Sequence, residues 1–79
     1  SVMFSDPFVD IGSILGHYVP ISNWEQWLIS YGIHPTSDVL EKTYWYAILS
    51  MLQAIKKYDL KGEYQKMNQE IVQLKRIYV

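Results

Sequence analysis

The 79-residue sequence contains no cysteine. Disulfide bridges and thiolate metal sites are therefore excluded, although both are common means of stabilising very small domains. His17 and His34 have no second histidine or carboxylate at the spacing of metal ligands, so we expect no metal and no cofactor. Association with another protein surface remains as a further means of stabilising a domain of this size.

The sequence also has little net charge and no long apolar run. Seven Lys and Arg residues against eight Asp and Glu residues give a net charge of −1, which makes nucleic acid an unfavoured partner. The most apolar segment, residues 44–55, is well below the ~20 residues that span a bilayer, so we expect no transmembrane segment. The first residues lack the basic start and apolar run of a signal peptide, which favours an intracellular location but leaves the compartment open.

Apolar and aromatic residues are abundant, at 49% and 15% of the sequence, so the chain is expected to fold. Asp6-Pro7 is typical of a helix start and Gly16 of a helix end, which together predict a first helix over residues 7–15. Gly12 and Gly16 lie one turn apart, which would allow a neighbouring backbone to approach closely. The simpler interpretation, which we favour, is one flexible glycine and one helix cap.

Two further helices are indicated by their caps. Ser22 and Glu25 fit a capping box, and Gly32 fits a helix end, so a second helix is expected over residues 23–31. Its predicted buried stripe is Trp24, Trp27, Leu28 and Tyr31. Ser37 is the expected N-cap of a central helix over residues 38–58. A helical wheel gives this helix an apolar half, made of Leu40, Tyr44, Ala47, Ile48, Met51, Leu52, Ile55 and Tyr58. Its polar arc is made of Glu41, Lys42, Thr43, Ser50, Gln53, Lys56 and Lys57.

The C-terminal third carries a heptad seam, made of Leu60, Tyr64, Met67, Ile71, Leu74 and Tyr78. Gly62 is interpreted as a turn before this last helix, in preference to a weak point within one long helix. The seam would either close on the central helix or pair with a second chain. Consecutive aromatic residues cannot all enter one core, so Trp45 and Tyr46 are added as contact residues. The alternative, left open, is that these aromatic residues cap the bundle against the first helix. The predicted partner-binding residues are Trp45, Tyr46, Tyr64, Met67, Ile71, Leu74 and Tyr78.

No catalytic motif emerges. Gly12-Ser13-Ile14-Leu15-Gly16 resembles a serine nucleophile elbow, but that motif requires glycine two residues before the serine, where this chain has Ile11. Both histidines adjoin predicted turns and are interpreted as surface or turn-stabilising residues. We therefore expect a protein that is not an enzyme.

One stretch supports a different function. Trp27-Leu28, Tyr31-Gly32-Ile33 and a new helix at Ser37 follow the order helix, extended link, helix. This order resembles that of helix-extension-helix domains such as SAP, and the resemblance implies nucleic-acid binding. Members of that family that grip DNA place a basic residue near the second helix start, where this chain has Asp38 and Glu41. Attachment to a membrane surface through the central helix, with aromatics at one end and Lys56 and Lys57 at the other, is a weaker alternative.

The sequence as a whole predicts a single all-α domain over residues 1–79, which could be a piece of a longer chain. We expect a small bundle of about four helices, with two short N-terminal helices and a hairpin of the central and C-terminal helices. Its expected function is that of a non-catalytic protein–protein interaction or assembly module. The expected partner is a second copy, giving a homodimer, or another protein.

Overall fold

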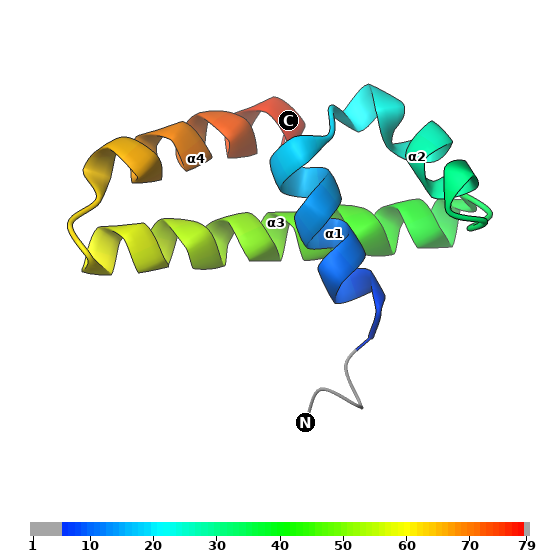
Figure 1. The fold of residues 1–79 in the computed structure, drawn as a ribbon, viewed down its shortest axis with the longest axis horizontal. Helices are drawn as coiled ribbons and strands as arrows, with labels where there is room; N and C mark the ends of the chain where they lie inside the picture. The colour runs from blue at the N-terminus through cyan, green and yellow to red at the C-terminus, as the bar shows by residue number, and fades with distance from the viewer. Residues whose placement is uncertain (1–5, 79) are drawn as a thin grey trace.

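The computed structural model describes residues 6–78, which form four α-helices and no strand. The helices are α1 (Phe8–Tyr18), α2 (Trp24–Ser30), α3 (Ser37–Leu60) and α4 (Tyr64–Ile77), and a short 3-10 turn (Ile21–Asn23) precedes α2. Figure 1 shows α4 running antiparallel to α3 along its C-terminal half, while α2 lies beside the N-terminal part of α3 and α1 crosses α3 near its middle. The prediction of a small all-α bundle is confirmed.

Helix α1 starts as predicted but ends later. The backbone N–H of Phe8 donates to Asp6 Oδ1 over 2.9 Å, so the aspartate accepts from a free N–H at the helix start. The helix then continues through Gly16 to Tyr18, and the predicted end at residue 15 is wrong. It stops at Val19, which is extended (φ −122°, ψ 126°), because the following Pro20 disfavours helical backbone in the residue before it.

The two glycines of α1 lie where this helix touches α3. A Cβ atom on Gly12 would lie 2.6 Å from Tyr46 Cβ and 3.0 Å from the Ala47 backbone nitrogen. A Cβ atom on Gly16 would lie 2.9 Å from Ala47 Cβ. These distances are shorter than van der Waals contact, so the absence of a side chain at both positions sets how closely the helices approach. The interpretation of Gly12 as a flexible residue and Gly16 as a cap is therefore wrong, and the alternative of close backbone approach is correct.

Helix α2 lacks the predicted capping box. Ser22 lies inside the 3-10 turn, in which the Asn23 N–H donates to the Pro20 carbonyl over 2.9 Å. No side chain among the described residues caps α2. Leu28 is buried as predicted, but Tyr31 is 67% exposed. Gly32 ends the helix as predicted, with φ +79° and hydrogen bonds from its own N–H and that of Ile33 back into α2.

Helix α3 begins one residue earlier than expected. The Thr36 hydroxyl accepts from the Val39 N–H over 3.2 Å, so Thr36 and not Ser37 is the N-cap. Gly62 has φ +71°, and the Glu63 N–H donates to the Tyr58 carbonyl over 2.9 Å, which closes the end of α3. The turn at Gly62 is therefore confirmed, and one continuous helix is excluded.

The core is small, and the face that α3 buries matches the predicted apolar half except at two positions, Thr43 and Leu52. The buried apolar residues are Leu15, Trp24, Leu28, Ala47, Ile48, Met51 and Ile77. Thr43, expected in the polar arc, is fully buried, and its hydroxyl donates to the Val39 carbonyl over 2.7 Å. Leu52, expected in the apolar half, is 49% exposed. The reason is that α1 crosses α3 beside Gly12 and covers the Thr43 side of the helix.

Candidate interaction surface

The described residues leave much of their large apolar surface uncovered. Thirteen large hydrophobic side chains are exposed, compared with seven hydrophobic residues in the buried core. Single exposed apolar residues are common and need no explanation. A contiguous group is informative, because soluble monomers seldom expose one without a binding role.

Such a group lies on α3. Trp45, Leu49 and Leu52 are 53%, 48% and 49% exposed. Their spacing of four and three residues places them on one side of the helix, one above the other. Trp45 and Leu52 lie about half a turn from Thr43, which meets α1, and so face away from the crossing helix. Leu49 lies at the edge of this side, where it lines a small hollow next to α1. We call these three residues the α3 stripe.

The ends of α3 carry opposite charges around the stripe. Asp38 and Glu41 are exposed before it, and Lys56 and Lys57 are exposed after it. Lys42, also near the N-terminal end, is engaged within the chain, because its ammonium group forms an ion pair with Asp6. The exposed residues are therefore acidic at the N-terminal end of α3, whereas at its C-terminal end Lys56 and Lys57 outnumber the single acidic residue, Asp59.

The ion pair between Asp6 and Lys42 ties the start of α1 to α3. The pKa of Asp6 lies below its ordinary value, first because Lys42 donates a hydrogen bond to the carboxylate and then because the Phe8 N–H does so. The pKa of Lys42 is raised, chiefly by its hydrogen bond to Asp6. The Lys42 ammonium also lies 4.9 Å from the centre of the Phe8 ring, within cation–π range.

The structure does not bring the predicted partner-binding residues together. Trp45 belongs to the α3 stripe, but Tyr46 is half-buried in the contact between α1 and α3, and its hydroxyl donates to Asp6 Oδ2 over 3.4 Å. In the seam, Met67, Ile71 and Leu74 are partly buried, while Tyr64 and Tyr78 are each 58% exposed. Leu74 packs against the core, so this part of the seam is intramolecular and its aromatic ends are uncovered.

Leu49 and Leu52 were not predicted as contact residues. The helical wheel predicts Leu52 in the buried half of the central helix and places Leu49 in neither half. Their spacing from Trp45 was the available signal, since positions 45, 49 and 52 share one helix face.

Family models and solved structures were compared with the chain. No family model matches the chain, and no solved structure is significantly similar to it. The function must therefore be inferred from the surface of the molecule itself.

A polar cluster joins α1, α3 and α4. His17 Nε2 lies 3.1 Å from Ser50 Oγ, and Ser50 Oγ donates to Ser13 Oγ over 3.0 Å. His17 Nδ1 lies 2.6 Å from Glu70 Oε1, which has no well-aligned hydrogen bond. The expectation of a surface or turn histidine is wrong for His17, because its side chain is only 21% exposed and lies within a helix.

The order of serine, histidine and carboxylate in this cluster is that of a hydrolytic triad, but its setting differs. Both serines lie inside helices, where backbone N–H groups are committed to helical hydrogen bonds and cannot stabilise an oxyanion. The arrangement suits a different task, which is to satisfy polar side chains where three helices meet.

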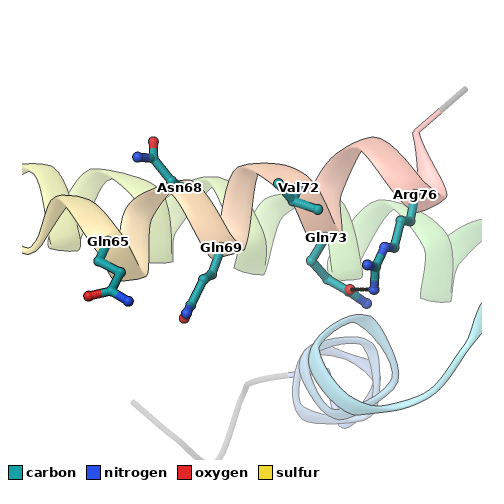
Figure 2. Close-up of a pocket in the computed structure, with 6 residues that line it drawn as sticks. All are labelled: Gln65, Asn68, Gln69, Val72, Gln73 and Arg76. Atoms are coloured by element: carbon teal, nitrogen blue, oxygen red, sulfur yellow. Dashed lines mark hydrogen bonds between the residues drawn. The ribbon is translucent and has the colours of Figure 1, made fainter.

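A separate hollow of about 530 Å³ runs along α4 and is lined mainly by amide side chains (Figure 2). Gln65, Gln69 and Gln73 extend from one side of the helix, and Arg76 Nη1 donates to Gln73 Oε1 over 3.4 Å. Gln73 Nε2 also donates to the Gly16 carbonyl over 3.3 Å, which links α4 to α1. This face is polar and already partly hydrogen-bonded, so it is a poorer candidate for tight contact than the α3 stripe.

Two further features bear on the site. Within residues 6–78, no helix combines the length and hydropathy needed to cross a membrane. The same part of the chain contains no group of three or more His, Asp or Glu side chains placed to hold a metal ion.

Proposed function

We infer that the protein is a non-catalytic interaction module that self-associates through the α3 stripe. The observation that carries this proposal is the row formed by Trp45, Leu49 and Leu52, three large apolar side chains about half exposed on one uncovered helix face. Tryptophan is among the residues that contribute most energy at protein interfaces. Covering such a row with apolar atoms removes it from water, which favours association.

The charges around the stripe favour a second copy of the chain as the partner. In a two-fold symmetric dimer with antiparallel α3 helices, the acidic end of one helix faces the basic end of the other. Glu41 would then approach Lys56 of the second copy, and Trp45 would pack beside Leu52 of that copy. A parallel arrangement would place like charges together, which is unfavourable.

The size of the stripe implies a weak dimer. Covering the exposed halves of one tryptophan and two leucines on each copy contributes about 7 kcal/mol in total. The loss of translational and rotational freedom offsets much of this gain. At most about 3 kcal/mol then remains from the stripe, so we expect a dissociation constant of several millimolar.

Sedimentation equilibrium tests the proposal. At several millimolar the wild-type chain should show an average mass clearly above that of the monomer, and Leu49→Glu should remain monomeric at the same concentration. Val72→Glu is the matched control, because Val72 is 51% exposed and lies on α4, away from the stripe. A wild-type monomer of 9.3 kDa at that concentration would refute self-association, and equal effects of the two variants would refute the α3 stripe as the interface.

Charge reversal tests the antiparallel arrangement. Lys56→Glu should weaken the dimer severalfold, and the addition of Glu41→Lys in the same chain should restore it, because the two positions would again carry opposite signs. Lys66→Glu, on α4, is the control for the change in net charge. Failure of the second substitution to restore the dimer would refute the antiparallel pairing but not the stripe.

A further inference from the structure

A second concave site lies between the 3-10 turn, α2 and the first turns of α3. It is a hollow of about 430 Å³. Its apolar lining comes from Ile21, Trp24, Leu40 and Tyr44. Trp24 is 2% exposed and Tyr44 is partly buried, so these aromatic residues are held in place by the fold. Clefts of roughly 300–1,000 Å³ with such linings are typical of small-molecule sites.

The charged side chains that line this hollow are both acidic. Glu25 and Glu41 line it, and neither forms an ion pair within residues 6–78. No lysine, arginine or histidine lines the hollow. The Trp24 indole N–H is already used, since it donates to the Val19 carbonyl over 2.9 Å. The site therefore offers carboxylate acceptors and aromatic groups but no cationic donor for an anion.

We propose that this hollow binds a small organic cation with an apolar body. The ammonium group would lie between Glu25 and Glu41, and the apolar body would occupy the space beside Trp24 and Tyr44. Carboxylates and the electron-rich faces of aromatic rings both attract such a cation. Glu41 is shared with the proposed dimer contact, whereas Glu25 belongs to α2 and lies outside the α3 stripe, so Glu25 is the residue that tests this site separately.

Three probes with the same phenylethyl body test the proposal: 2-phenylethylammonium, 2-phenylethanol and 3-phenylpropanoate. Titrations are followed by the NMR shift of the Trp24 indole N–H, assigned with a Trp24→Phe variant. The ammonium probe should bind with a dissociation constant in the millimolar range or below, and the neutral alcohol should bind at least about threefold more weakly. The carboxylate should bind most weakly of the three.

Variants separate specific recognition from non-specific apolar contact. Glu25→Gln should weaken binding of the ammonium probe at least about threefold and leave binding of the alcohol unchanged. Glu63→Gln, at the turn before α4, should leave both unchanged. Thermal unfolding of each variant checks that the fold is retained. Equal affinity for the ammonium and the alcohol, unchanged affinity in Glu25→Gln, or no shift of the Trp24 signal up to 20 mM ammonium would each overturn the proposal.

Discussion

Replacing Gly12 by alanine should destabilise the protein, although alanine is the better helix former. At an unhindered position within a helix, this change stabilises by about 1 kcal/mol. At Gly12, the new Cβ would meet Tyr46 Cβ at 2.6 Å, the Ala47 nitrogen at 3.0 Å and the Thr43 carbonyl oxygen at 3.1 Å. Two of these atoms belong to the α3 backbone and cannot rotate away, so α1 must move.

The expected magnitude follows from these opposing effects. Overpacking of a close contact costs about 1–3 kcal/mol, and the cost should lie near the upper limit where backbone atoms are met. Subtracting the gain in helix propensity leaves a net loss of about 2 kcal/mol. For a domain of this size, that loss lowers the melting temperature by roughly 8–16 °C. Urea unfolding followed by circular dichroism at 222 nm measures the change in free energy.

A double-mutant cycle tests the geometry further. Gly16→Ala should also destabilise, but its closest contact is Ala47 Cβ at 2.9 Å, so the loss caused by Gly16→Ala should be smaller in a chain that already carries Ala47→Gly. The loss of stability caused by Gly12→Ala should change little in the presence of Ala47→Gly, because the new Cβ at position 12 meets Tyr46 Cβ and backbone atoms of α3. An alanine at position 12 that is neutral or stabilising would refute the close contact between α1 and α3.

Three other predictions concern stability. The pKa of Asp6 is lowered from its ordinary value of 3.8, so its contribution to folding stability is present above that pH and is lost as the pH falls through the lower pKa of the folded state. Lys42→Met should make this loss of stability in acid smaller. Urea unfolding midpoints measured between pH 2 and pH 6 test this prediction. Leu74→Ala should cost about 2–4 kcal/mol because this residue packs against the core, whereas the exposed Gln69→Ala should be within about 0.5 kcal/mol of wild type in the same assay. Tyr46→Ala should lower the free energy of unfolding by about 2 kcal/mol or more, because this side chain lies in the contact between α1 and α3. Thermal unfolding measures the change, and an unchanged stability would mean that this contact is not formed.

The helices and their breaks could be predicted from the sequence because the signals are local. Gly32 and Gly62 adopt the positive φ that helix ends favour, and Pro20 ends α1 in the residue before it. The prediction for Gly16 was wrong because the role of this residue depends on a partner helix. A glycine in a close helix contact has the same local surroundings as a glycine at a helix end, and only the position of Ala47 across the contact distinguishes them.

The candidate surface was predicted only in part for a similar reason. Trp45 was identified because three consecutive aromatics cannot enter one core. The exposure of Leu52 could not be predicted, because the side of α3 that remains uncovered depends on where α1 crosses it. The burial of Thr43 follows from the same crossing, since its short side chain leaves room for the α1 backbone beside Gly12.

The contact between α1 and α3 also determines which substitutions the chain can accept over evolution. No side chain can rearrange between Gly12 and the α3 backbone, so this contact has less freedom to adapt than an ordinary apolar core. Distant relatives that keep this arrangement should retain small residues at the positions of Gly12, Gly16 and Ala47. The residues of the α3 stripe lie outside this contact and are free of this constraint. A search for relatives should therefore give most weight to two small residues four apart in a first helix and a third in the helix that crosses it.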